Sequence, residues 1–229
     1  MSKRTRSEQA KKNTIYSQSS IVAGAIAVLV IALVAATYLF ESDSTPSLPD
    51  GKTAREAALA SEHSPTLGNP NAKVHIVEFL DPACETCALF FPIVKQWMAD
   101  VPTDIRLSVR HVAFHKGADY AVRILEASRN QDKYWQTLEA LLASQSQWVQ
   151  HHVVQPDRVG PAIRSVGLDM EQLMADMNSV AVMQRVERDK KDSIVLKVSA
   201  TPDYYVNGRP LPSFGQRQLA ELIREELKK

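Results

Sequence analysis

The chain contains two cysteines, Cys84 and Cys87, and they form one C-x-x-C motif. A disulfide between them would close a loop of only two intervening residues, so it would constrain little of the chain. Two thiols at this spacing suit thiol–disulfide exchange, in which a thiolate attacks a disulfide and a second thiol resolves the mixed disulfide. A helix N-terminus would stabilise the anion of the first cysteine and lower its pKa. The motif therefore predicts a redox site with Cys84 as the attacking thiol and Cys87 as the resolving thiol.

Metal and haem sites are alternative uses of the same cysteines. His111 and His115 would complete a zinc-binding set, but 23 residues separate Cys87 from His111, where about 12–15 are usual. A c-type haem motif requires histidine at the position of Ala88. We therefore expect no cofactor beyond the dithiol itself and no bound metal. A protein that holds copper or zinc with Cys84, Cys87 and a histidine stays open as the alternative function.

The residues around the motif predict a strand, a loop and a helix. Residues 73–80 are β-branched and apolar, as in a buried strand. From Cys84 onward, apolar side chains recur at helical spacing, which places the cysteine pair at the N-terminus of a helix. The other expected elements are a strand at 105–112, helices within 117–148 and 156–197, a strand at 201–208 ending in an Asn-Gly hairpin turn, and a helix at 216–229.

The N-terminal region predicts a membrane anchor. Residues 21–40 contain no charged side chain, and a helix of twenty residues spans about 30 Å, the thickness of a bilayer core. Residues 1–20 carry a net charge of +4 and acidic residues follow the apolar segment, so the positive-inside rule places residues 1–20 in the cytoplasm. A cleaved signal peptide is the alternative, although its apolar region is typically only about 7–15 residues long.

The composition limits the classes of partner. Of the 229 residues, 45% are hydrophobic and 23% are charged, as in an ordinary globular protein. Outside residues 1–20 the net charge is −3, which leaves no basic excess to neutralise nucleic-acid phosphates. The sequence contains no separate dimerisation domain, so we expect a monomer.

The segment from Val77 to Cys87, VEFLDPACETC, followed much later by Thr201-Pro202, resembles the thioredoxin superfamily. It is most similar to the DsbA-like branch, in which helices are inserted between the second and third strands. The resemblance implies an α/β thioredoxin fold with an inserted helical block, preceded here by a single transmembrane helix. The expected division of the chain is a cytoplasmic tail at 1–20, a transmembrane helix at 21–40, a linker at 41–65 and the thioredoxin-like domain at 66–229, with the insertion at about 116–199.

The resemblance also implies roles for individual residues. Cys84 is the nucleophile, Cys87 is the resolving thiol, and Pro202 follows a cis peptide bond beside them. Thr201 and Pro202 would bind an extended substrate through backbone hydrogen bonds. Glu78, six residues before Cys84, matches a buried acid of the family that could accept the proton of Cys87. The apolar neighbours of Glu78 favour burial over an exposed position on the strand.

Together these features predict a membrane-anchored thiol–disulfide oxidoreductase. Its catalytic domain would face the periplasm from the inner membrane, and its substrates would be the thiols and disulfides of other proteins. It would also need a redox partner protein, which the sequence does not identify.

Glu85 places a carboxylate beside Cys84, which opposes stabilisation of the thiolate. We therefore expect a reduction potential below the roughly −120 mV of DsbA, toward the roughly −270 mV of thioredoxin. A chaperone or interaction module is a third reading, against which the intact cysteine pair weighs.

Overall fold

The computed structural model describes residues 51–60 and 62–229. The predicted cytoplasmic tail at 1–20, the predicted transmembrane helix at 21–40 and the first part of the predicted linker lie outside the described residues. These three assignments therefore stay predictions. Among the helices that the structure does describe, none has both the length and the apolar character needed to cross a membrane.

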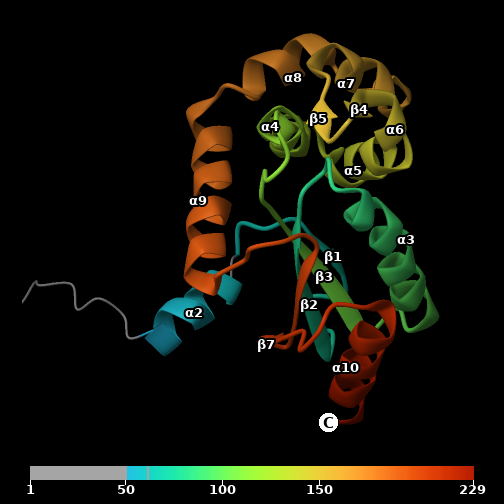
Figure 1. Cartoon of the computed structure of the whole chain (residues 1–229), viewed down its shortest axis with the longest axis vertical. Helices are drawn as coiled ribbons and strands as arrows, with labels where there is room; N and C mark the ends of the chain where they lie inside the picture. Colours follow the sequence, from blue (N-terminus) through green and yellow to red (C-terminus); the bar gives the residue numbers. More distant parts are fainter. Residues whose placement is uncertain (1–50, 61) are drawn as a thin grey trace, which may run out of the picture. The chain divides into compact units, whose positions relative to one another are not determined.

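A five-stranded mixed sheet forms the centre of the domain (Figure 1). Its strand order is β1-β3-β2-β6-β7. The central strand β2 runs parallel to β3 and antiparallel to β6. The strands are β1 (Thr66–Gly68), β2 (Val74–Leu80), β3 (Ile105–His111), β6 (Asp203–Val206) and β7 (Arg209–Pro210). The strands predicted around 73–80, 105–112 and 201–208 are confirmed, whereas β1 was not predicted.

Strand β2 is buried on both faces, which explains its nearly continuous apolar sequence. Because side chains alternate along a strand, Ile76 and Leu80 join one hydrophobic cluster and Val77 and Phe79 join another. The first cluster includes side chains of helices α3 (Glu85–Asp100) and α10 (Gln216–Lys228). The second includes side chains of helices α2 (Gly51–Ala60) and α9 (Val180–Leu196). Figure 1 shows these two helix pairs on opposite sides of the sheet.

A helical block separates β3 from β6, as predicted for about residues 116–199. It is interrupted more often than the sequence suggested, because the segment 117–148 bends at a 3-10 turn and at Asp132, whose φ is +54°. A two-stranded hairpin also lies within the block and was not predicted. The remaining elements are α4 (Ala118–Ser128), α5 (Tyr134–Ala143), α6 (Gln145–Trp148), β4 (Val149–Gln150), β5 (Val153–Val154), α7 (Pro156–Ala162) and α8 (Met170–Asp176).

Part of the segment expected to be a linker is folded against the domain. Ala58 in α2 is buried, and its carbonyl oxygen accepts a hydrogen bond from Nη1 of Arg110 at 2.6 Å. Nε2 of His63 lies 2.9 Å from Oδ1 of Asp189 in α9. The same carboxylate accepts a hydrogen bond from Nε of Arg110 at 2.6 Å. Residues before β1 are therefore joined to both β3 and α9.

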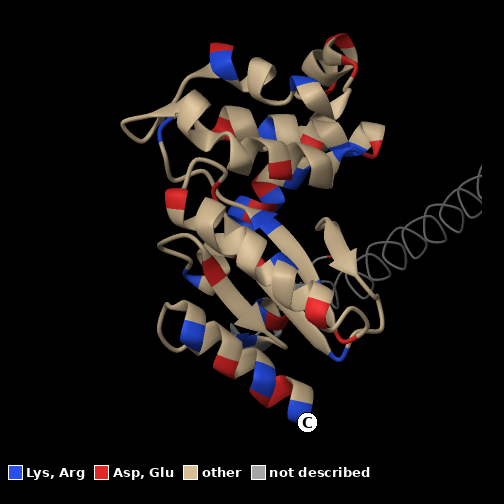
Figure 2. Ribbon diagram, turned by 90° about the vertical axis from the view of Figure 1, so that its right-hand side faces the viewer, with Lys and Arg blue, Asp and Glu red and all other residues tan. Residues whose placement is uncertain are grey.

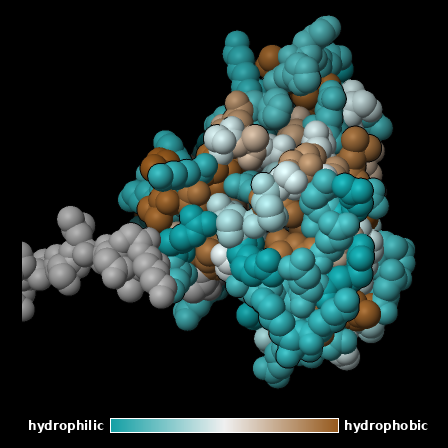
Figure 3. Space-filling model, turned by 60° about the horizontal axis from the view of Figure 1, so that its bottom comes forward, coloured by the Kyte–Doolittle hydropathy of each residue, from teal (hydrophilic) through white to brown (hydrophobic). Residues whose placement is uncertain are grey.

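Charged residues of both signs are interspersed over the face shown in Figure 2, which shows no continuous basic stripe. The face shown in Figure 3 is largely hydrophilic, with hydrophobic side chains in separate patches.

Candidate active site

The two cysteines lie where β2 ends and α3 begins. β2 ends at Leu80, a short loop follows, and Cys84 is the N-cap residue of α3 with extended backbone angles of φ −82° and ψ 119°. Cys87 lies within the first turn of the helix and is completely buried, whereas Cys84 is 6% exposed. Both are free thiols. The strand, loop and helix predicted around the motif are confirmed.

Hydrogen bonds around Cys84 favour its thiolate form. The largest contribution comes from the side chain of Cys87, and the backbone N–H groups of Thr86 and Cys87 add to it. Thr201 contacts the sulfur in two ways: its carbonyl oxygen lies 3.3 Å from Sγ and accepts a hydrogen bond from the thiol, while its side chain stabilises the thiolate. Burial opposes ionisation, but the pKa of Cys84 is nevertheless lowered to about 5. Cys84 is therefore ionised at neutral pH.

The pKa of Cys87 is shifted in the opposite direction. Burial is the main cause of its rise, and the hydrogen bond to Cys84 and the charge of Glu78 raise it further. Cys87 thus keeps its proton while Cys84 has lost one. Two groups in contact whose environments separate their pKa values in this way can act as nucleophile and proton donor.

Glu78 lies in the middle of β2 and is completely buried. It pairs with Tyr204 across the β2–β6 ladder, and the Tyr204 hydroxyl donates a hydrogen bond to Oε1 at 3.0 Å. Among the residues that the structure describes, Oε2 has no hydrogen-bond partner. Burial is the main reason that the pKa of Glu78 rises to about 8, despite the hydrogen bond from Tyr204. The expected burial of Glu78 is confirmed, and its charge acts on both cysteines.

The Thr201–Pro202 segment lies beside the cysteine pair, as the resemblance implied. The peptide bond between the two residues is cis. A hollow of about 470 Å³ adjoins it, and its lining comes from three segments that converge on the N-terminus of α3. The lining residues are Thr86, Ser199, Ala200, Thr201, Pro202, Asp203, Leu211, Pro212, Ser213 and Phe214.

Asp81 was not predicted from the sequence, although it holds the loop before Cys84. Its carboxylate is completely buried. Oδ1 accepts a hydrogen bond from the backbone N–H of Ala83 at 2.8 Å. Oδ2 accepts hydrogen bonds from the backbone N–H groups of Phe114 and His115 at 2.8 Å, and Nδ1 of His115 lies at the same distance. The only sequence feature that pointed to this role of Asp81 was its position between a strand and the C-x-x-C motif.

The histidines considered as zinc ligands have other partners. Nε2 of His111 lies 2.7 Å from the Tyr134 hydroxyl, and His115 is hydrogen-bonded to Asp81. Within residues 51–60 and 62–229, no three His, Cys, Asp or Glu side chains are grouped so that they could hold a metal ion. No observation therefore favours the metal-handling alternative.

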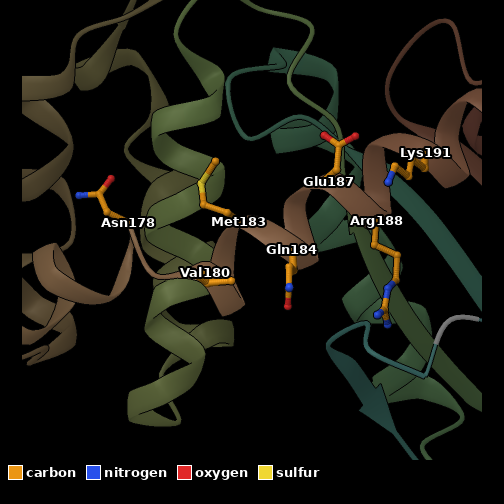
Figure 4. A pocket seen from close by; sticks show the side chains of 7 residues that line it. All are labelled: Asn178, Val180, Met183, Gln184, Glu187, Arg188 and Lys191. Carbon is orange, nitrogen blue, oxygen red and sulfur yellow. The ribbon is translucent and has the colours of Figure 1, made fainter.

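A larger hollow, of about 710 Å³, lies away from the cysteines (Figure 4). It is lined almost entirely by side chains of α9. The lining contains no cysteine and no residue of the hollow beside Pro202. Its residues are Asn178, Val180, Met183, Gln184, Glu187, Arg188 and Lys191.

Comparison with known proteins agrees with this geometry. The family model described as "Thioredoxin" matches residues 60–225. The chain belongs to the thioredoxin family. It is 30% identical over 173 residues to disulfide bond formation protein D of Bacillus subtilis, covering 72% of this chain and 77% of that protein. It is also 32% identical over 144 residues to a Na⁺/H⁺ antiporter NhaA of Herminiimonas arsenicoxydans, covering 63% of this chain and only 22% of the antiporter.

Solved structures of this family share the fold. A thioredoxin-like oxidoreductase from Silicibacter pomeroyi superimposes with a TM-score of 0.65 at 29% identity, covering 76% of this chain and 98% of that one. The α-DsbA1 protein of Wolbachia pipientis gives a TM-score of 0.66, with 76% and 96% of the two chains covered. Its 18% identity shows the fold alone. The α/β thioredoxin fold with a helical insertion and the DsbA-type resemblance are confirmed, and the chain is a homologue of protein thiol–disulfide oxidoreductases.

Proposed function

We propose that this protein is a thiol–disulfide oxidoreductase that exchanges disulfides with cysteine pairs of other proteins. The observation that carries the proposal is the placement of the two thiols at the N-terminus of α3, with Sγ of Cys84 3.3 Å from the carbonyl oxygen of Thr201 and Cys87 completely buried in the first turn. These surroundings lower the pKa of Cys84 to about 5 and raise that of Cys87. The hollow beside Pro202 supplies room for a substrate chain next to Cys84.

The exchange begins when the Cys84 thiolate attacks a substrate disulfide. A bond forms between Sγ of Cys84 and one substrate sulfur, the substrate disulfide breaks, and the other substrate sulfur leaves as a thiolate. Glu78 in its ionised form, which becomes populated as the pH approaches its pKa of about 8, accepts the proton of Cys87. Cys87 then attacks Sγ of Cys84, which releases the second substrate sulfur as a thiolate. The substrate is reduced and the Cys84–Cys87 pair is oxidised. The reverse sequence oxidises a substrate dithiol.

Thr201 and Pro202 would hold the substrate backbone during the exchange. Their position beside Sγ of Cys84 supports this role, because an extended peptide in the adjacent hollow would lie within reach of the sulfur. Glu78 would serve as the proton acceptor for Cys87. Its burial and high pKa support the role, since a carboxylate is a stronger base when its pKa approaches that of the group it deprotonates.

The compartment and the partners belong to the same proposal. A structural relative from Salmonella enterica is described as a periplasmic thioredoxin-like protein. We place the catalytic domain of the present protein outside the cytoplasm, tethered to the inner membrane through residues 21–40, as a monomer. A second protein would restore the redox state of the dithiol after each exchange.

Two serine variants test the division of labour between the cysteines. Cys87→Ser should accumulate mixed disulfides between Cys84 and substrate proteins, because attack continues while resolution is lost. Cys84→Ser is the matched control and should accumulate few. Both variants would be isolated under acid quench and compared by non-reducing electrophoresis and mass spectrometry. Equal trapping by the two variants, or trapping by neither, would contradict the proposed function.

A further inference from the structure

Gln145 joins the helical block to the loop that carries Cys84. It begins α6, is only 7% exposed and lies 61 residues after Cys84 in sequence. Its Nε2 donates hydrogen bonds to the carbonyl oxygens of Pro82 at 2.8 Å and of Cys84 at 3.0 Å. Because both neighbours are acceptors, only the nitrogen of the amide suits this position.

The loop between β2 and α3 is held at a second point by Asp81. The Asp81 carboxylate binds the N–H of Ala83 within the loop and the N–H groups of Phe114 and His115 after β3. Gln145 binds the carbonyl groups of the residues on either side of Ala83. Side-chain hydrogen bonds thus hold both the N–H and the C=O groups of this loop.

We infer that Gln145 is a positioning residue for the Cys84 sulfur. By fixing the carbonyl groups of Pro82 and Cys84, it keeps Sγ of Cys84 at the N-terminus of α3 and beside Thr201. The inference deepens the proposed function and rests on it, because it concerns the nucleophile of the proposed exchange.

Short-range contacts give this position its chemical effect. The backbone N–H groups of Thr86 and Cys87 and the side chain of Thr201 stabilise the Cys84 thiolate, and hydrogen bonds weaken steeply as distance and angle depart from their preferred values. Loss of the Gln145 amide would release the loop from the position that aligns these donors with Sγ. It would also leave two carbonyl dipoles near the thiolate without their N–H partner. Both changes disfavour the anion.

Gln145→Met tests the inference, because methionine is similar in length and lacks the N–H donors. The matched control is Gln147→Met, the same change at an exposed position of the same helix. The pKa of Cys84 would be measured in the full-length reduced protein from the ultraviolet absorbance of the thiolate against pH. We expect Gln145→Met to raise this pKa by at least about 0.3 unit, a twofold change in the thiol–thiolate equilibrium. The disulfide should become correspondingly less oxidising in glutathione buffers, and Gln147→Met should match the wild type in both measurements.

A purely structural role would give a different result. Gln145→Met would then unfold more readily while the pKa of Cys84 and the potential stayed at their wild-type values, and this outcome would overturn the inference. If Gln145→Met does not fold, Gln145→Asn replaces it, because asparagine keeps an amide but is too short to reach both carbonyls. A raised Cys84 pKa in Gln145→Asn would support the inference, and an unchanged pKa would overturn it. A wild-type protein whose Cys84 has an ordinary thiol pKa would contradict the proposed function itself. An acidic wild-type pKa that neither variant changes contradicts only the role of Gln145.

Discussion

The chemistry of the site begins with two identical side chains in different surroundings. Cys84 meets hydrogen-bond donors at the helix N-terminus, whereas Cys87 faces the interior and the carboxyl group of Glu78. The pKa of Cys84, about 5, lies between the roughly 3.5 of DsbA and the roughly 7 of thioredoxin. Because the stability of the thiolate sets the oxidising power of the disulfide, we expect a reduction potential between those of the two proteins.

Glu78 should make the stability of the reduced protein depend on pH. Folded Glu78 keeps its proton up to about pH 8, whereas the unfolded chain releases it near 4.5. The stabilisation is therefore complete below about pH 4.5 and is lost as the pH rises through 8, by about 5 kcal/mol at most. Glu78→Gln is neutral at every pH and should remove this dependence.

The measurement is the free energy of unfolding from urea titrations between pH 4.5 and pH 8. Cys84 titrates in the same range with the opposite effect, because its pKa is lowered on folding. The difference between Glu78→Gln and the wild type isolates the contribution of Glu78. Glu187→Gln, a change at an exposed position of α9 outside the redox site, is the control. Identical pH profiles for Glu78→Gln and the wild type would show that Glu78 is not buried in its neutral form.

Single residues also show how far sequence reasoning extends. Cys84 and Cys87 could be identified from the motif, and the burial of Glu78 from its apolar neighbours, but the role of Glu78 required the family resemblance. Thr201 and Pro202 required the family resemblance, since an X-Pro bond is cis in only about 5–6% of cases. Gln145 carried no local signal, because its role depends on a tertiary contact with a loop 61 residues away.

At the scale of elements, those that follow from a local sequence pattern could be predicted, whereas those that depend on long-range packing could not. Strands β2 and β3 and helix α3 follow from alternation and helical periodicity within short windows. The helical block was predicted as a region, but its breaks depend on a left-handed residue at Asp132 and on contacts that no short window contains. Helix α2 lies in a segment that was expected to be a linker. The contact between α2 and the domain depends on Arg110. The sequence pattern around Arg110 does not indicate which residue it binds.

Asp189 should be the most sensitive residue of the contact between α9, β3 and the segment before β1. Its carboxylate binds Arg110, which is completely buried, as well as His63 and the backbone N–H of His111. Burial opposes ionisation of Asp189, but His63 and Arg110 hold its pKa below the ordinary value. Asp189→Asn removes one of the two carboxylates paired with Arg110, the other being Asp192. It should lower the free energy of unfolding by about 2 kcal/mol, because hydrogen bonds to charged groups are weakened.

Chemical denaturation of the full chain checks this prediction. Glu187→Gln, on an exposed position of the same helix, should stay within about 0.5 kcal/mol of the wild type. A loss in Asp189→Asn no larger than that of Glu187→Gln would mean that Arg110 is compensated by other groups. The redox site should keep its Cys84 pKa in both variants, because Asp189 contributes to none of the contacts that stabilise the thiolate.

At the scale of the whole molecule, the elements that support the active site are distinct from the residues that react. The sheet and the helices on its faces hold β2 and α3. The helical block reaches back to the Cys84 loop through Gln145, and Asp81 ties the same loop to the segment after β3. The proposed placement of this domain outside the cytoplasm depends on residues 21–40. We expect the full chain to remain with membranes after a carbonate wash. A reporter that is active only outside the cytoplasm should be active when fused after Lys229. Recovery of a shortened, soluble protein would identify the apolar segment as a cleaved signal.

The central claim is that this fold makes Cys84 an acidic nucleophile beside the hollow at Pro202 and keeps Cys87 a protonated thiol. The most direct test is the pH dependence of alkylation of the reduced wild-type protein, with the modified cysteine identified by mass spectrometry. We predict that Cys84 reacts first, with a half-maximal rate near pH 5, and that Cys87 stays unmodified over the same range. A half-maximal rate near the ordinary cysteine pKa of about 8.5, or modification of both cysteines at equal rates, would contradict the claim.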